Sequence, residues 1–398
     1  MSSETIYLDN NATTRVAPEV IEAMLPYFDG HYGNPSSIHR FGGNVHKQIE
    51  VAREQVAGLL NAKPSQVYFT GCGSESDNLA LQGFYRRQGH CTKLISSSVE
   101  HHAVLYTCKY LNRHGAALTE LAVDENGMLN LDDLKSQPMD DRTLLSFMWA
   151  NNETGVIFPI EKITEIAKER GALIHTDAVQ AVGKVPIDVT ATPVDFLALS
   201  GHKLHAPKGI GALFIRDATD IDPLLIGGHQ EGGVRAGTEN VPYIIGLGKA
   251  CELARKNMPE ENTRVRALRD RLEKGILATC KGALLNGDPV ARLPNTTNIS
   301  FEFIEGEGIL LLLDEYGICA SSGSACTTGS LEPSHVLRAM GVAYTRAHSA
   351  TRFSLSRYTT EEEIDKVLAV LPGIVDKLRS LSPYIKSEEV QVPLPVQG

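Results

Sequence analysis

The stretch Ile160-Glu-Lys-Ile-Thr-Glu-Ile-Ala-Lys-Glu-Arg-Gly-Ala-Leu-Ile-His-Thr-Asp177 places a helical pattern directly before a short apolar run. The helical pattern ends at Gly171, as expected for a helix C-cap. The apolar run from Ala172 to His175 has the length of a buried strand. The stretch therefore predicts a helix that leads into a strand, which is the repeating unit of an α/β fold.

The same alternation extends from about Val67 to Arg216. Further apolar runs occur at Val67–Thr70, Lys93–Ser96, Thr143–Met148, Phe196–Leu199 and Gly211–Ile215. Helical patterns lie between several of these runs, so we predict a mainly parallel sheet that helices cover on both faces. Ligands bind beyond the carboxyl ends of the strands in such sheets, and the candidate site residues are expected there.

The C-terminal part of the chain predicts a second, smaller unit. The composition turns polar around Met258–Asn262, after a helix predicted over Ile244–Asn257, and we place the crossing there. A later helical pattern from Ile364 to Leu378 contains Pro372, which predicts a kink or break. The polar tail after Pro383 is expected to be loose. The strands predicted for this unit are Asn298–Phe303, Gly317–Ala320 and Thr351–Leu355.

The overall composition excludes several classes of protein. The 398 residues carry a formal net charge of −10, which argues against nucleic acid or an anionic membrane as the main partner. The apolar run Gly308–Asp314 is too short to span a bilayer, and Met1–Asn11 lacks the pattern of a secretory signal. The seven cysteines form no CxxC pair, so we expect a reduced, cytoplasmic protein with mostly buried thiols.

A glycine-containing turn follows the first predicted strand, in Thr70-Gly-Cys-Gly-Ser-Glu-Ser-Asp-Asn78. Backbone N–H groups at Gly73, the hydroxyls of Ser74 and Ser76, and the N-terminus of the next helix would together bind a phosphate. Either serine would also serve as an ordinary helix cap, so the segment alone leaves both interpretations open.

Two other predicted strands end in charged residues. Asp177 ends one strand, where a carboxylate would meet a cation such as a protonated pyridine nitrogen or would cap the following helix. Lys203 follows another strand in Ser200-Gly-His-Lys203. A lysine beside an apolar sheet forms Schiff bases readily, although a lysine after a strand is more often a surface residue. Ser200 and His202 would reach a phosphate. An aspartate at the end of one strand and a lysine after the next, with a glycine-containing turn earlier in the chain, together favour one shared site.

The segment Gly317-Ile-Cys-Ala-Ser-Ser-Gly-Ser-Ala-Cys-Thr-Thr-Gly-Ser330 contains two cysteines. Cys326 lies among small and polar residues, which would leave its thiol exposed as a nucleophile that reaches a substrate and then a partner. The alternative is an idle surface thiol. Cys319 lies in a strand pattern and looks structural. The histidines of Val99–His102 and His202–His205 have no evident carboxylate partner, so we expect no metal site.

Together these segments resemble the cysteine desulfurases, which are fold-type-I pyridoxal phosphate enzymes. The resemblance to the family covers residues 5–384. It rests on eight motifs in the order of the family, namely Tyr7–Thr14, Tyr32–Ser37, Val99–His101, Trp149–Gly155, His175–Gln180, Ser200–Lys203, Ser321–Cys326 and Arg352–Leu355. Within the family, the stretches Met148–Gly155, His202–Gly209 and Ala236–Asn240 look most like the nitrogen-fixation (NifS) type.

The resemblance implies an α/β fold with a mainly parallel seven-stranded sheet in a large cofactor domain, residues 15–257. A smaller α+β domain would consist of residues 1–14 and 258–384, with a loose tail over 385–398. The implied molecule is a cytoplasmic homodimer that binds pyridoxal 5'-phosphate and L-cysteine. It would pass sulfur to an iron–sulfur scaffold protein.

The resemblance also implies catalytic roles. Lys203 would hold the cofactor as a Schiff base, His101 would stack on its ring and transfer protons, and Asp177 would pair with the pyridinium nitrogen. Cys326 would attack the sulfur of L-cysteine, which leaves L-alanine and a persulfide. The implied cofactor-binding residues are Gly73, Ser74, Asn152, Asp177, Gln180, Ser200, His202, Lys203 and, from the other subunit, Thr238. The implied substrate carboxylate site consists of Asn34 and Arg352.

Two positions depart from the family's pattern. Ser74 stands where threonine is more common, which keeps the hydroxyl, and Gly232 stands where relatives usually carry arginine, which leaves the charge contact there open. The rival functions are another lyase or transaminase on the same cofactor, such as a selenocysteine lyase, and a non-catalytic sulfur carrier. A transaminase does not need Cys326, and a carrier does not need Lys203 and Asp177.

Overall fold

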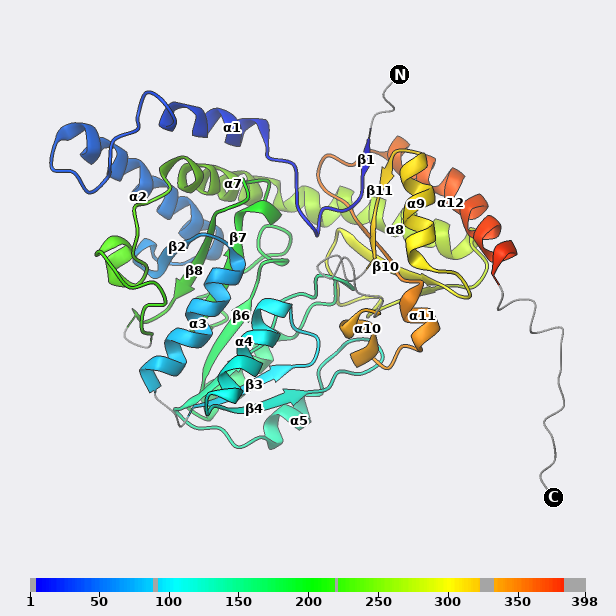
Figure 1. The fold of residues 1–398 in the computed structure, drawn as a ribbon, viewed down its shortest axis with the longest axis horizontal. Coiled ribbons are helices and arrows are strands. Elements are labelled where there is room, and N and C mark those ends of the chain that lie inside the picture. The colour runs from blue at the N-terminus through cyan, green and yellow to red at the C-terminus, as the bar shows by residue number, and fades with distance from the viewer. Residues whose placement is uncertain (1–4, 89–91, 219–220, 323–332, 383–398) are drawn as a thin grey trace.

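The computed structural model describes residues 5–88, 92–218, 221–322 and 333–382 (Figure 1). Within these ranges the chain forms a larger unit around a seven-stranded sheet and a smaller unit around a four-stranded sheet. Both units consist of helices and strands, in agreement with the α/β expectation.

The seven-stranded sheet has the order β2-β8-β7-β6-β5-β3-β4. Its strands are β2 (Val67–Thr70), β3 (Lys93–Ser97), β4 (Ala117–Leu121), β5 (Thr143–Ser146), β6 (Leu173–Asp177), β7 (Phe196–Ser200) and β8 (Gly211–Ile215). Strand β8 is antiparallel to both of its neighbours, and every other pair is parallel. The prediction of a mainly parallel seven-stranded sheet is therefore confirmed.

Alternate residues of one central strand show how helices cover both faces of this sheet. Phe196 and Ala198 pack with α3 and α4, whereas Leu197 and Leu199 pack with helices on the opposite face. This alternation is the two-residue period of a strand, and both faces are apolar because both are covered. The helices are α3 (Gly73–Gln88) and α4 (His102–Arg113) on one face, and α1 (Pro18–Met24), α2 (Arg40–Leu60), α6 (Ile160–Glu169) and α7 (Val241–Glu260) on the other.

The smaller unit surrounds an antiparallel sheet of order β12-β13-β10-β9. Its apolar cluster joins Ile6 and Leu8 to residues between Val265 and Val375. The domain limits given above stay a prediction.

The α-helices and strands not yet named belong to both units. They are β1 (Ile6–Tyr7), β9 (Ala283–Leu285), β10 (Thr296–Phe301), β11 (Ile318–Cys319), β12 (Ser321–Ser322), β13 (Thr351–Ser354), α5 (Leu131–Ser136), α8 (Arg266–Thr279), α9 (Gly306–Glu315), α10 (His335–Ala339), α11 (Tyr344–His348) and α12 (Glu361–Leu381).

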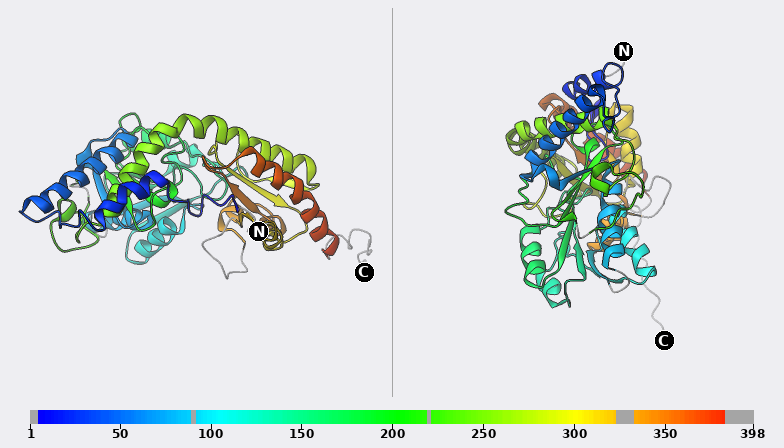
Figure 2. Two further views of the ribbon diagram at one scale, coloured as in Figure 1. Left: turned by 90° about the horizontal axis from the view of Figure 1, so that it is seen from above. Right: turned by 90° about the vertical axis from the view of Figure 1, so that its left-hand side faces the viewer.

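The connection between the units is helical. Helix α7 continues through a π-helical turn, Glu261–Val265, into α8, and together they form a long ridge that reaches from one unit to the other (Figure 2). The polar composition around Met258 therefore marks no loop. The predicted break at Pro372 is wrong, because α12 runs through this residue. Its buried face, which includes Ile364, Leu371 and Val375, stabilises the helix across the lost hydrogen bond.

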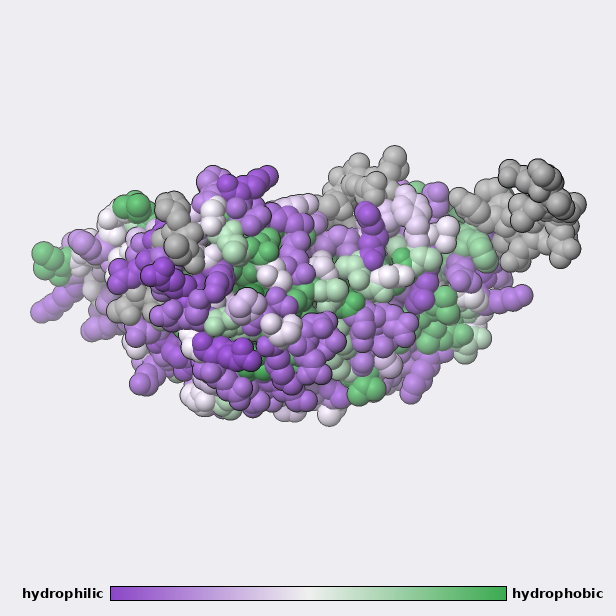
Figure 3. All heavy atoms as spheres, turned by 90° about the horizontal axis from the view of Figure 1, so that it is seen from below, coloured by the Kyte–Doolittle hydropathy of each residue, from purple (hydrophilic) through white to green (hydrophobic). Residues whose placement is uncertain are grey.

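The apolar residues of the chain lie mainly in three buried clusters. On the face shown in Figure 3, hydrophilic residues predominate and the hydrophobic residues form separate patches rather than one continuous band. No helix in the described part of the chain is long and apolar enough to cross a membrane.

Candidate active site

A cavity of about 360 Å³ lies at the carboxyl ends of β6 and β7. Parallel strands end at the same edge of a sheet, so residues distant in sequence meet there. The predicted site residues that line this cavity are Gly73, Ser74, His101, Asn152, Asp177, Gln180, Ser200, His202, Lys203 and Arg352.

The turn between β2 and α3 forms one end of the cavity. A Cβ atom added at Gly73 would lie 2.8 Å from Val179 Cγ2 and 3.3 Å from Ser200 Cβ, so only glycine allows this close approach. The Ser76 hydroxyl is 2.7 Å from Thr70 Oγ1 and stabilises the turn, whereas Ser74 lines the cavity. The buried Ser200 Oγ has no hydrogen-bond partner among the described residues. Together with the N-terminus of α3, these groups fit an anion such as a phosphate.

Asp177 and Lys203 bring opposite charges to the cavity. The backbone N–H of Val179 donates to Asp177 Oδ1 at 2.9 Å, so the local capping contact also exists. Burial raises the pKa of Asp177 to about 6, although this hydrogen bond and the Lys203 charge lower it. Lys203 ends a 3-10 turn directly after β7. Its Nζ donates to the backbone oxygens of Asn11 and of Ala12, the latter at 2.7 Å, so it is not a free surface lysine.

Two histidines in the cavity wall are held in the neutral form. The pKa of His101 is lowered to about 4 by burial and then by the charge of Lys203. His101 caps α4, and its Nδ1 accepts from the backbone N–H of Ala103 at 3.2 Å, so Nε2 carries the hydrogen. Burial followed by Lys203 also lowers the pKa of His202 to about 4. Near neutral pH, each ring is therefore uncharged and can donate one hydrogen bond through the nitrogen that carries its proton.

A buried polar chain beneath Asp177 was not anticipated from the sequence. Asp77 Oδ1 lies 3.4 Å from His175 Nε2, and neither atom has a hydrogen-bond partner among the described residues. His175 Nδ1 lies 2.8 Å from Ser146 Oγ. Burial, followed by the nearby Asp177, raises the pKa of Asp77, whereas burial lowers the pKa of His175 to about 3. Asp77 and His175 therefore add little charge near Asp177. In the sequence, only their presence in the motifs Thr70–Asn78 and His175–Gln180 indicated that they lie close to the site.

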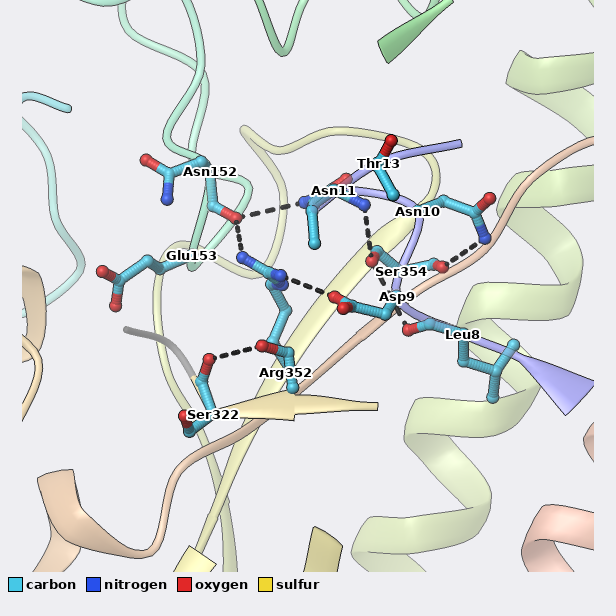
Figure 4. Close-up of polar contacts among 12 residues, drawn as sticks. Leu8, Asp9, Asn10, Asn11, Thr13, Asn152, Glu153, Ser322, Arg352 and Ser354 are labelled. Carbon is cyan, nitrogen blue, oxygen red and sulfur yellow. Dashed lines mark hydrogen bonds and ion pairs between the residues drawn. The ribbon is translucent and has the colours of Figure 1, made fainter. Parts of the chain in front are cut away.

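The smaller unit contributes Arg352, whose surroundings Figure 4 shows. Arg352 is only 2% exposed, and its Nη2 lies 2.7 Å from Asp9 Oδ1. Its Nη1 donates to the backbone oxygen of Asn152 at 2.9 Å. Asn11 Nδ2 donates to the same oxygen at 3.2 Å. The sequence motif Tyr7–Thr14 contains Asp9 and Asn11, but their contacts became apparent only in the structure.

Glu153 is a further cavity residue, and its sequence motif alone indicates no role for it. It lines the cavity, and its Oε2 accepts a short hydrogen bond from Ser334 Oγ. Burial raises the pKa of Glu153 to about 7, although Ser334 and Arg352 lower it. An acidic side chain beside Arg352 therefore titrates near neutral pH.

Two predicted site residues in the described part of the chain, Asn34 and Thr238, do not line this cavity. Cys326 lies outside the described residues. Asn34 is exposed, and its Oδ1 accepts from the backbone N–H of Ser36 at 2.9 Å. Thr238 lines a separate cavity of about 180 Å³, together with Gly71. Among the described residues, no group of three or more histidine, cysteine or acidic side chains is arranged to hold a metal ion.

Comparison with known proteins agrees with this geometry. The family model for aminotransferase class-V matches residues 6–367, so the chain belongs to the aminotransferase class-V family. A cysteine desulfurase from Trichormus azollae is 56% identical over 383 residues, which are 96% of each chain. The cysteine desulfurase NifS from Azotobacter vinelandii is 56% identical over 380 residues, 95% of this chain and 94% of the relative.

Solved structures give the same result. A NifS-like protein superimposes with a TM-score of 0.88 at 39% sequence identity, over 94% of this chain and 100% of that chain. Within its family, the chain is thus a member of the cysteine desulfurases. The predicted family and fold are confirmed.

Proposed function

We propose that this chain uses pyridoxal 5'-phosphate to convert L-cysteine to L-alanine and forms a persulfide on Cys326. The observation that carries the proposal is the meeting of Lys203, Asp177 and the Gly73 turn at one cavity. A Schiff-base amine, a counter-ion for a pyridinium and an anion site are the three groups that this cofactor requires.

The described residues fit the cofactor. Ser74, Ser200 and His202 would hold the phosphate beside the N-terminus of α3, and the orphaned Ser200 Oγ supports this assignment. Asp177 would stay ionised beside a pyridinium, which offsets the cost of burying its charge. Asn152 and Gln180 would contact the ring hydroxyl. When bound, the cofactor supplies an electron sink for the carbanion formed at the substrate Cα.

Lys203 and His101 would move the protons. The Lys203 amine lies in the cavity wall and would take the α-proton of L-cysteine. His101 donates through Nε2 because its Nδ1 is occupied by Ala103, which suits stacking on the ring and proton transfer around the substrate. Arg352 and Asn34 would bind the substrate carboxylate, and the guanidinium of Arg352 provides a bidentate partner.

Cys326 would carry the sulfur step. Its thiolate attacks the substrate sulfur, a sulfur–sulfur bond forms and the carbon–sulfur bond breaks. The electron pair of the broken bond stays on the substrate, which takes up a proton and leaves as L-alanine. The terminal sulfur would then pass to an iron–sulfur scaffold protein, and the resemblance to NifS supports a role in nitrogen fixation.

A homodimer is part of the proposal, because Thr238 lines a separate cavity rather than the candidate active site of its own chain. Thr238 would contact the phosphate bound in the partner subunit. Sedimentation of a fully active monomer would contradict this assignment. The free thiols of Cys72, Cys108, Cys251, Cys280 and Cys319 support a reducing compartment, and we propose the cytoplasm.

The substitution Cys326→Ala tests the central step. It should keep cofactor binding and the spectral response to L-cysteine but lose L-alanine formation by several orders of magnitude, because no thiolate accepts the sulfur. Activity on selenocysteine should persist, since selenium leaves without thiolate attack. Cys319→Ala is the matched control, because Cys319 lies in β11 and burial raises its pKa. Full L-cysteine activity in Cys326→Ala would refute the proposed mechanism.

A further inference from the structure

The N-terminal segment Asp9–Asn11 is fixed against the smaller unit. The backbone N–H of Ser354 donates to Leu8 O at 2.8 Å, and that of Asn10 donates to Ser354 O at 3.1 Å. The backbone N–H of Asn11 also donates to Ser354 Oγ at 2.9 Å. These bonds align the segment with β13, which carries Arg352 two residues before Ser354 (Figure 4). Asp9 therefore has a defined position beside the guanidinium.

The guanidinium of Arg352 donates hydrogen bonds to two acceptors, one on each terminal nitrogen. Asp9 Oδ1 lies 2.7 Å from Nη2, and the Asn152 oxygen accepts from Nη1 at 2.9 Å. Arginine has two N–H groups on each terminal nitrogen, so one on each nitrogen is left by these two contacts. A carboxylate that binds both remaining groups would be recognised in a bidentate manner.

Asp9 acts from behind the cavity rather than inside it. Arg352, Asn11 and Asn152 line the cavity, whereas Asp9 does not. Its carboxylate supplies the negative charge that a buried guanidinium needs, and it removes the freedom of the Arg352 side chain to rotate. A group in this place can affect a cavity ligand only through Arg352.

The same segment also reaches the lysine side of the cavity. The backbone oxygen of Asn11 accepts from Lys203 Nζ and, at 3.0 Å, from Gln180 Nε2. One short stretch of chain therefore holds Arg352 through Asp9 and contacts Lys203 through Asn11. The distance between a carboxylate and an amino group bound at these two residues would depend on this stretch.

We infer that Asp9 is a positioning residue that orients Arg352 for the substrate carboxylate and thereby sets the preference for amino acids over amines without a carboxylate. The inference rests on the proposed role of Arg352. A purely structural ion pair would instead stabilise the chain without affecting this preference.

Equilibrium binding to the holoenzyme separates the two roles. The holoenzyme is titrated with L-alanine and with ethylamine, which lacks the carboxylate, and binding is followed by the cofactor spectrum. The dissociation constant of ethylamine divided by that of L-alanine gives the carboxylate preference. Asp9→Ala should lower this ratio by about 10- to 100-fold, as expected for the loss of a charge-assisted hydrogen bond that orients the guanidinium. Asp9→Asn keeps an oxygen acceptor and should lose less than about tenfold.

The control is Asn10→Ala. Asn10 Nδ2 donates to the backbone oxygens of Tyr7 and Ser354 and does not contact Arg352. Asn10→Ala removes these two bonds but keeps the backbone bonds of the segment and the Asp9–Arg352 pair, so it should keep the preference. Thermal unfolding checks that each variant is folded, and Asp9→Asn serves if Asp9→Ala does not fold.

Arg352→Gln distinguishes failure of the inference from failure of the proposed function. If Arg352→Gln loses the preference while the Asp9 variants keep it, or weaken both ligands equally, the positioning role is overturned and the proposed site stands. If Arg352→Gln keeps the preference, the carboxylate site itself is wrong and the inference falls with it.

Discussion

The unit around the large sheet and the unit around the small sheet carry buried charge in different ways. On the side of the large sheet, Glu100 accepts hydrogen bonds only from neutral donors, the Ser97 hydroxyl and the Met148 backbone N–H, in the contacts described. Burial raises the pKa of Glu100 to about 8. On the side of the small sheet, Arg352 meets Asp9 at 2.7 Å, and Arg292 meets Glu273 at 2.5 Å.

This difference shows what each side needs from a ligand. On the small-sheet side, Arg352 already forms an ion pair with Asp9, so an anionic ligand that binds Arg352 must share the guanidinium with that carboxylate. On the large-sheet side, burial raises the pKa values of Asp77, Glu100 and Asp177, so an ionised carboxylate there carries a desolvation cost. A cation bound beside Asp177 would offset part of that cost.

The largest expected effect follows from removing the amine of the large-sheet side. Lys203→Ala should lower L-alanine formation from L-cysteine by about 10⁴-fold or more, because this residue would supply both the Schiff base and the base for the α-proton. The rate is measured from L-alanine released, and the visible absorption reports bound cofactor. Lys208→Ala is the control, since Lys208 is an exposed lysine nearby in sequence. Near wild-type activity in Lys203→Ala would show that the amine of the large-sheet side is not needed for the reaction.

A smaller effect, on stability, tests the unbalanced carboxylates. The pKa of Glu100 is raised from 4.5 to about 8, so the folded state binds this proton more tightly than the unfolded state. The stability that this proton gives is present at low pH and is lost as the pH rises from about 4.5 to about 8. Glu100→Gln does not ionise, so its free energy of unfolding relative to the wild type should rise by about 3 kcal/mol between pH 5 and pH 8.

Urea unfolding at the two pH values measures this difference. The control is Glu120→Gln, because Glu120 is exposed and lies 3.5 Å from Lys109. It should change the free energy of unfolding by less than about 1 kcal/mol at either pH. A Glu100→Gln effect that does not vary with pH would show that the carboxyl is compensated in the folded chain.

Strands buried on both faces could be predicted from the sequence. Val67–Thr70 and Gly211–Ile215 match β2 and β8 at both ends, because an apolar run bounded by polar residues is a strong local pattern. Strand β4 was missed, since this edge strand, Ala117–Leu121, is partly exposed and contains polar residues. Packing also kept α12 intact across Pro372, a tertiary effect that no local pattern contains.

Site residues could be predicted where a charged residue with a known chemical role stands at or just after the end of a predicted strand. Asp177 ends β6 and Lys203 follows β7, and the structure brings both to the cavity. Asp9 and Asp77 could not be assigned in this way. Asp9 meets Arg352 across 343 positions of sequence, and Asp77 meets His175 through the packing of α3 on the sheet. Contacts of this kind depend on the assembled fold rather than on a motif.

Strand β8 acts as a spacer of fixed width. Its first residue, Gly211, pairs with Thr70 on one side and with Ser200 on the other. Two strand spacings separate the ends of β2 and β7 by about 10 Å. The turn that leads into α3 and the turn that carries Lys203 therefore begin at strand ends whose separation is set by backbone hydrogen bonds. Side-chain substitutions in the cavity wall would change the contacts with a ligand and would leave that separation unchanged.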